Sequence, residues 1–217
     1  MSNFSYRTLK DYGEAELIVN KSKFIAYAKK TETEEDARNF LAEIKKKHYD
    51  ATHNCSAYII KPENGVELNK ADDDGEPGGT AGRPILEVLK KNELINVIVI
   101  VTRYFGGIKL GSSGLIRAYG KAAGLGIAAA KVVVRGLYSK MEIIISYELL
   151  GKLENEIKNK NYIMGDKEFS DNVKVYVFIK KENEDNFLKE IEALTAAKAT
   201  VNIVEETYID IEVDEFI

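Results

Sequence analysis

An unbroken run of mostly β-branched residues, from Ile95 to Thr102, is the feature that most constrains the fold of this chain. A strand that lacks hydrophobic–polar alternation is apolar on both faces, so both faces must be covered. A helical pattern precedes the run over residues 84–92, with Pro84 near its first turn, and a longer one follows over 113–132. The run therefore predicts the central strand of a mixed α+β fold.

Alternation and polar punctuation predict three further strands in the front half, over residues 14–20, 23–30 and 53–61. The sequence Thr33-Glu34-Glu35-Asp36 marks a helix start, because carboxylates favour the positive end of a helix dipole. This helix ends in Lys45-Lys46-Lys47. Residues 62–79 are predicted as one long polar loop.

The back half predicts the order βαββαβ, which is the ferredoxin-like arrangement. Its elements are a strand over 139–146, a helix over 147–159, strands over 162–169 and 173–180, a helix over 182–197 and a strand over 201–213. Residues 1–135 carry 21 Lys and Arg against 17 Asp and Glu, whereas residues 136–217 carry 10 against 18. We therefore predict two domains, residues 1–135 and 136–217.

Composition favours a globular, cytoplasmic protein. Hydrophobic residues make up 45% of the chain and charged residues 30%, as in ordinary folded proteins. No stretch approaches the roughly 18 apolar residues of a membrane span, and the residues after Met1 lack the apolar run of a secretory signal. The single cysteine, Cys55, excludes an internal disulfide and fits a reducing compartment. We expect no contact with a membrane.

Two glycine-rich segments, residues 72–84 and 102–114, each lead into a predicted helix. Glycine lets backbone N–H groups converge, and a helix N-terminus adds positive potential, so such loops suit anions. The long helix is predicted to begin with Ser112 or Ser113 as its cap. The predicted anion- or nucleic-acid-binding residues are Arg83, Arg103, Lys109, Ser112, Ser113, Arg117 and Lys121. The alternative is that the cations form a solvated face.

Aromatic and glycine residues near these cations each have two interpretations. Tyr104 and Phe105 could stack nucleobases beside Arg103, or they could be buried at the end of a core strand. Gly120 and Gly124 each cost a helix interior about 1 kcal/mol relative to Ala. A closely packed backbone at that face would offset this cost.

An acidic cluster, Asp72-Asp73-Asp74-Gly75-Glu76, could hold Mg²⁺, pair with nearby cations or remain solvated. It fails the EF-hand pattern, because Lys70 and Ala81 fall where the first and twelfth ligands are required. We therefore predict no metal site and no cofactor.

His53 and Cys55 share one face of their strand. They are either a nucleophile pair or, as we expect, a buried cysteine beside a hydrogen-bonded histidine. With two His and one Cys in the chain, a zinc site is not supported. We predict no catalytic residue.

The same motifs resemble the signature of the IMPACT/YigZ family. The main segments are Asp73-Asp74-Gly75-Glu76-Pro77 with Gly79-Thr80-Ala81-Gly82, and Val101-Thr102-Arg103-Tyr104-Phe105-Gly106-Gly107-Ile108-Lys109-Leu110-Gly111. Thr52-His53-Asn54-Cys55 and Gly114-Leu115-Ile116-Arg117-Ala118-Tyr119 support them. The resemblance covers nearly the whole chain. The sequence departs from it at Gly78, where Ser is usual and the acidic loop could be looser, and at Ser112-Ser113, where Thr-Gly is usual.

The resemblance implies a left-handed βαβ front domain, similar to a ribosomal protein and to domain IV of elongation factor G, followed by a ferredoxin-like domain. Eukaryotic relatives regulate translation through a stress-kinase pathway by binding its activator protein. The resemblance also implies a shared surface. It comprises His53, Asp73, Asp74, Glu76 and Tyr104, together with Arg103, Lys109 and Arg117.

We therefore expect a translation-associated regulatory binding protein whose partner is RNA, the ribosome or a translation factor. One alternative is a phosphate-handling, Mg²⁺-dependent, kinase-like enzyme, suggested by Gly111-Ser112-Ser113-Gly114 and the acidic cluster. The other is a protein-interaction regulator that binds no nucleic acid. The sequence contains no Walker A pattern, and no DNA specificity can be read from it.

Overall fold

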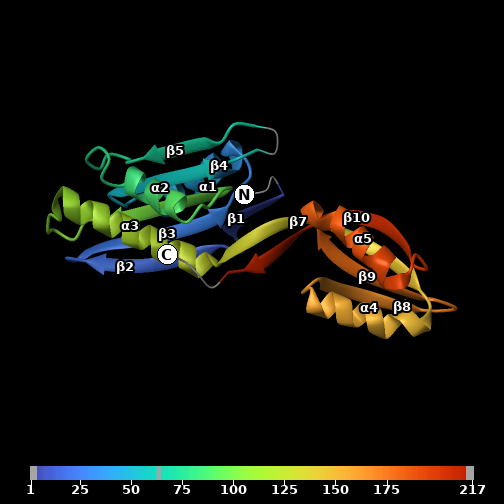
Figure 1. The fold of residues 1–217 in the computed structure, drawn as a ribbon. Helices are drawn as coiled ribbons and strands as arrows, with labels where there is room; N and C mark the ends of the chain where they lie inside the picture. The colour runs from blue at the N-terminus through green and yellow to red at the C-terminus, as the bar shows by residue number, and fades with distance from the viewer. Residues whose placement is uncertain (1–3, 63–64, 214–217) are drawn as a thin grey trace. The chain divides into compact units, whose positions relative to one another are not determined.

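The computed structural model describes residues 4–62 and 65–213, which divide into two compact units (Figure 1). The N-terminal unit comprises residues 6–134 and 211–213, and the C-terminal unit comprises residues 4–5 and 135–210. A single boundary at residue 135 therefore does not separate the two units. The first described residues group with the C-terminal unit, and the last group with the N-terminal unit.

The front of the chain forms β1 (Ser5–Leu9), β2 (Gly13–Val19), β3 (Ser22–Lys30), α1 (Glu34–Lys47), β4 (His53–Ile60), β5 (Leu68–Asp72), α2 (Gly82–Lys91), β6 (Val97–Tyr104) and α3 (Gly111–Ala130). An antiparallel sheet has the order β2-β3-β6-β4-β5. Both β3 and β4 run antiparallel to β6, so they are parallel to each other. Together with α1, the strands β3 and β4 form a βαβ unit, and β6 lies between these two strands in the sheet.

The central strand β6 alternates between two hydrophobic cores. Val97, Val99 and Val101 pack with residues of α2 and α3, whereas Ile98 and Ile100 pack with residues of α1. All five side chains are 0% exposed. The sheet therefore carries helices on both faces, which confirms the prediction from the unbroken apolar run.

Short-range chemistry sets the ends of the neighbouring elements. Thr33 Oγ1 accepts the Asp36 N–H at 3.0 Å, so a side-chain cap begins α1 at the predicted helix start. Asn20 and Lys21 connect β2 to β3, and their φ angles of 44° and 64° suit a tight hairpin turn. The predicted helix start is confirmed, as are the two strands predicted over residues 14–20 and 23–30.

Several predicted boundaries are wrong. Residues 62–79 are not one loop, because β5 lies within them and pairs with β4. Every β5 residue is exposed, so the sequence shows no apolar alternation there from which a strand could be predicted. Helix α3 begins at Gly111 after Leu110, and no side chain caps it, so Ser112 and Ser113 lie in its first turn instead. The strand β1 was not predicted at all.

The rest of the chain forms β7 (Val132–Ile145), α4 (Tyr147–Asn159), β8 (Ile163–Phe169), β9 (Val173–Lys180), the 3₁₀ helix η1 (Lys181–Asn183), α5 (Glu184–Thr195) and β10 (Thr200–Glu212). A second sheet has the order β1-β7-β9-β8, and β10 also pairs with β7. The strand order β10-β7-β9-β8 in a βαββαβ chain is the ferredoxin-like arrangement, as predicted. Alternate residues of β7 and β9, such as Ile143 and Val175, pack against Leu153 of α4 and Phe187 of α5.

The backbones of β2 and α3 approach each other closely. A Cβ on Gly13 would lie 2.3 Å from the carbonyl oxygen of Gly126 and 2.4 Å from the nitrogen of Ala130, so only glycine fits. By contrast, a Cβ on Gly120 would meet only Val88 Cγ2, at 3.9 Å. The close packing that we expected at Gly120 therefore occurs further along the helix, at Gly126.

We predict opposite effects for two alanine substitutions in the N-terminal unit. Gly13→Ala should lower the free energy of unfolding by about 1–3 kcal/mol, because the new methyl group overlaps the α3 backbone. Gly120→Ala should raise it by about 0.5–1 kcal/mol, since Ala is the better helix former and the space is open. Urea denaturation of both variants measures the difference, and equal effects would contradict the packing described.

Candidate functional site

A buried ion pair joins the loop after β5 to the central strand. Arg103 Nη1 donates to Glu76 Oε1 at 2.6 Å, and the two side chains are only 6% and 3% exposed. The Tyr119 hydroxyl of α3 donates to the same oxygen at 2.7 Å. The Glu76 carboxylate therefore links β6 to α3. Because it is buried, its negative charge is stable only while Arg103 and Tyr119 donate to it.

His53 and Cys55, at the start of β4, fasten the same loop through its backbone. His53 Nδ1 lies 2.8 Å from the Asp74 carbonyl oxygen, which can only accept, so Nδ1 carries the proton. The Cys55 thiol donates to the Asp73 carbonyl oxygen at 3.0 Å. Burial raises the pKa of the Cys55 thiol far above its ordinary value. The geometry therefore fits a buried cysteine and not a nucleophile pair.

Asp73 caps α2 from the preceding loop. Its carboxylate accepts N–H groups from Gly79 at 2.7 Å, Ala81 at 3.0 Å and Gly82 at 2.8 Å. Burial raises the pKa of the Asp73 carboxyl, but these three backbone donors outweigh it, and the net pKa lies below the ordinary value. Asp73 thus replaces the side-chain cap that α2 lacks at Ala81.

The third carboxylate of the loop is also engaged within the protein. Asp74 accepts from Lys45 Nζ at 2.6 Å and from the Asn54 N–H at 2.7 Å. Of the interpretations considered for the acidic cluster, pairing with nearby cations describes Asp74 and Glu76, whereas Asp73 accepts backbone N–H groups. Within residues 4–62 and 65–213, no group of three or more His, Cys, Asp and Glu side chains is placed to hold a metal ion.

Arg103 requires a correction, because we expected it among the cations that face an anion. It lies in β6, its side chain is buried, and its Nη2 donates to Ser22 Oγ at 3.4 Å in addition to the Glu76 contact. Ser22 Oγ also accepts the Gly106 N–H at 3.2 Å. Gly106 lies so close to Lys21 that a Cβ would be 2.0 Å from its carbonyl carbon. Arg103 therefore fixes the loop after β6 against the β2–β3 turn.

Three predicted residues of the long helix, Ser113, Arg117 and Lys121, line a hollow at its start. This hollow, which we call the α3 hollow, has a volume of about 390 Å³. It is lined by Val19, Asn20, Leu110, Ser113, Gly114, Arg117, Ala118 and Lys121. The lining thus combines two cations and a hydroxyl with small and apolar residues, and it contains no carboxylate.

Cations around the α3 hollow are exposed and lack acidic partners. Lys109, Arg117 and Lys121 are exposed, and among the described residues none of them forms an ion pair. No Asp or Glu occurs between Glu93 and Glu142. Excess positive charge therefore remains on this surface, where it attracts anions.

The remaining predicted residues lie apart from the lining of the hollow. Arg83 is exposed in the first turn of α2, and Ser112 is exposed in the first turn of α3. The Tyr104 hydroxyl lies 2.8 Å from His48 Nδ1 and donates to Asp50 Oδ1 at 3.1 Å, so Tyr104 is engaged within the protein. The structure thus separates an internal network, with Arg103 and Glu76 at its centre, from an exposed group around α3.

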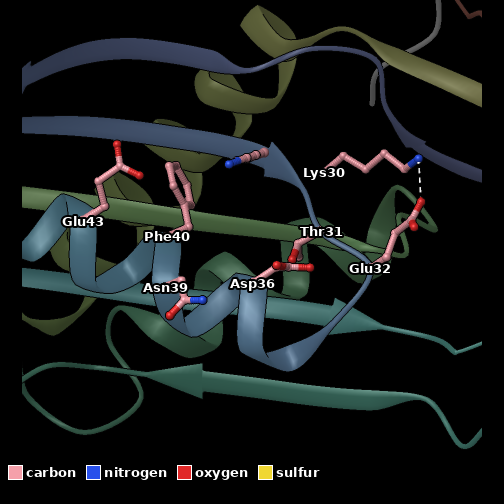
Figure 2. A pocket seen from close by; sticks show the side chains of 8 residues that line it. Lys30, Thr31, Glu32, Asp36, Asn39, Phe40 and Glu43 are labelled. Atoms are coloured by element: carbon pink, nitrogen blue, oxygen red, sulfur yellow. Dashed lines mark ion pairs between the residues drawn. The ribbon is translucent and has the colours of Figure 1, made fainter.

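A second hollow of about 390 Å³ lies beside α1 (Figure 2). Figure 2 shows Lys30 directed toward Glu32, with which it pairs at 2.8 Å. Lys29 Nζ lies 5.0 Å from the centre of the Phe40 ring, which also lines the hollow. The charged residues that line this hollow are of both signs, and two of them, Lys30 and Glu32, form an ion pair. None of the predicted site residues lines it.

Sequence reasoning missed residues that contact the site from distant elements. Tyr119 stands in a quoted motif, but nothing in its spacing indicated that it binds Glu76. Ser22 carries no motif, and its role depends on the pairing of β3 with β6. Val19 and Asn20 line the α3 hollow only because β2 packs against α3. No local sequence signal could have found these four.

Comparison with known families identifies both parts of the chain. The model of the Impact N-terminal domain matches residues 20–127, and a domain of unknown function (DUF1949) matches residues 143–198. The two matches thus define a two-domain protein of the Impact type. The chain belongs to the IMPACT/YigZ family.

Individual relatives support this membership along the whole chain. The IMPACT family member YvyE of Bacillus subtilis is 43% identical over 206 residues, which cover 95% of this chain and 94% of the relative. An IMPACT family member of Haemophilus influenzae is 32% identical over 195 residues, covering 86% and 91%. A solved structure described as a hypothetical protein shares the fold, with a TM-score of 0.58 at 24% identity, covering 93% of this chain and 98% of that one. In the part of this chain that the structure describes, no helix has the length and apolar character to cross a membrane.

We predict that Glu76 and Arg103 are strongly coupled. Glu76→Gln and Arg103→Met should each lower the free energy of unfolding by about 3–5 kcal/mol, because each leaves its partner buried without its counter-charge. The double variant should lose less than the sum of the two. A double-mutant cycle in urea at pH 7 measures the coupling, and additive losses would contradict it.

The three backbone donors to Asp73 predict a pH-dependent contribution to stability. A carboxyl whose pKa is lowered by folding stabilises the protein above its unfolded pKa of about 3.9 and loses that contribution as the pH falls further. Asp73→Asn should therefore lower the free energy of unfolding by about 1–2 kcal/mol at pH 7. The gap to wild type should narrow below about pH 4.

Denaturation series between pH 7 and pH 3 measure this gap. Glu87→Gln removes an exposed carboxylate of α2 and serves as the charge-matched control. A gap that is constant with pH would contradict the assignment of Asp73 as an ionised cap.

Proposed function

We propose that this protein is a translation-associated binding protein that contacts RNA, either free or within the ribosome, through the surface around the α3 hollow. The phosphate backbone would lie against Lys109, Arg117 and Lys121. Ser113 would add a hydroxyl donor, and Ser112 and Arg83 are exposed in the first turns of α3 and α2. The translational role rests on the resemblance to the IMPACT family, whose eukaryotic members regulate translation.

The observation that carries the proposal is the charge of the α3 hollow. Its cations are exposed, have no carboxylate partner among the described residues, and flank a lining without acidic groups. The start of α3 has no side-chain cap, so its first N–H groups add positive potential next to Ser113. A phosphate backbone is the polyanion that such a surface fits best.

The kinase-like alternative is less well supported by the same geometry. Its Mg²⁺ ligands would come from the acidic cluster, but Asp73, Asp74 and Glu76 already accept hydrogen bonds or ion pairs from the protein. Its glycine–serine segment forms the first turn of α3, outside that cluster. A regulator that binds only proteins remains distinguishable, because its association would depend weakly on salt.

Binding to ribosomes and to a single-stranded RNA oligonucleotide at about 50 and 200 mM salt tests the proposal. Wild type should bind more weakly as salt rises, since phosphate contacts release counterions. The variant Lys109→Ala/Arg117→Ala/Lys121→Ala should bind more weakly, and its log–log salt slope should be shallower by about 2, from about 0.7 per lost single-strand contact. Arg103 is left intact because it is part of the buried network.

A matched control removes the same charge elsewhere on the N-terminal unit. The variant Lys46→Ala/Lys61→Ala/Lys90→Ala changes three exposed lysines and should retain wild-type affinity. Equal losses in both variants would show that only net charge matters. Absence of wild-type binding at the lower salt would overturn the proposal.

A further inference from the structure

Phe105 is an exposed aromatic side chain at the end of the central strand. It follows β6 directly and is 47% exposed. Its backbone is fixed, because the Phe105 N–H donates to Thr52 Oγ1 at 3.0 Å. Its ring is supported from the protein side by the Arg103 guanidinium, whose Cζ lies 5.5 Å from the ring centre.

The support beneath Phe105 is itself rigid. The same guanidinium lies over the ring of Phe24, also at 5.5 Å, and Phe24 is 0% exposed. Glu76 holds the guanidinium by a 2.6 Å ion pair. Phe105 is therefore the solvent-facing member of a group of planar side chains that is anchored in the core. An exposed aromatic ring that is held in place loses little conformational freedom when it binds a planar ligand.

The position of Phe105 in the chain connects it to the α3 hollow. The next residue, Gly106, packs against the backbone of Lys21 in the β2–β3 turn, and the neighbouring turn residue Asn20 lines the hollow. The same loop then carries the exposed Lys109 and leads to Leu110, another lining residue. An aromatic ring thus lies beside a surface of exposed cations.

We infer that Phe105 is a stacking platform for an unpaired nucleobase, so that the RNA taken by this surface is single-stranded; this rests on the proposed function. Bases in a duplex are stacked on one another and cannot cover a protein ring, whereas single strands place successive bases on aromatic side chains and phosphates on nearby cations. A protein partner fits less well, because protein interfaces are depleted of Lys, and Lys109 and Lys121 are two of the three cations here.

The chain contains no tryptophan, so Phe105→Trp introduces a single fluorescent reporter at the platform. A 12-nucleotide single strand should quench its emission, and a duplex of the same length should not, because only the single strand can stack on the indole. Tyr49→Trp, at a position that is 87% exposed on the same unit, is the control and should remain unquenched.

Affinity provides the second readout. Phe105→Leu keeps an apolar side chain but removes the aromatic face, and it should weaken single-strand binding by about 5- to 100-fold, since one base stack is lost. Duplex binding, where present, should not change. Thermal unfolding should stay close to wild type because the side chain is exposed.

The outcomes separate the inference from the proposed function. Wild-type affinity in Phe105→Leu, together with lost binding in Lys109→Ala/Arg117→Ala/Lys121→Ala, would overturn the stacking platform and leave the phosphate surface standing. Equal quenching by single strand and duplex would overturn it as well. Absence of any RNA binding by wild type would overturn the proposed function and the inference with it.

Discussion

The buried pair between Glu76 and Arg103 is the contact on which the N-terminal unit depends for its loop geometry. Glu76 comes from a glycine-rich loop, Arg103 from the central strand, and Tyr119 from the long helix, and the three meet at one carboxylate oxygen. A buried charge without its counter-charge is strongly unfavourable. Replacing Glu76 or Arg103 alone is therefore more destabilising than the loss of the contact itself. Through Ser22 and Gly106 the same arginine also fixes the β2–β3 turn.

This arrangement assigns two different tasks to the family motifs. The acidic segment and the start of β4 are turned inward, because His53 and the three loop carboxylates Asp73, Asp74 and Glu76 contact backbone groups or internal cations. The loop after β6 and the start of α3 face the solvent, and their cations form no ion pair with any residue that the structure describes. The acidic segment and the start of β4 thus form internal contacts that hold the unit together. The loop after β6 and the start of α3 form the surface that we propose to bind RNA.

Periodicity was sufficient to predict the elements whose burial is regular. The unbroken run of β6 required two covered faces, and α1 and α2 with α3 supply them. The βαββαβ order of the back half followed in the same way from alternation in β7 and β9. By contrast, β5 is exposed throughout and is held only by pairing with β4, so it left no apolar pattern to read.

The sequence by itself determined the family, the mixed α+β class and the chemistry gathered in two glycine-rich segments, because motifs and short-range periodicity are local properties. Only the tertiary structure decided which charged groups are available. Arg103 and Lys109 are similar when read along the chain, yet Arg103 is buried against Glu76 and Lys109 is exposed to solvent. That difference arises because pairing depends on which distant segments the sheet and α3 bring within a few ångströms, and the free energy of a charge depends on that environment more than on its neighbours in sequence.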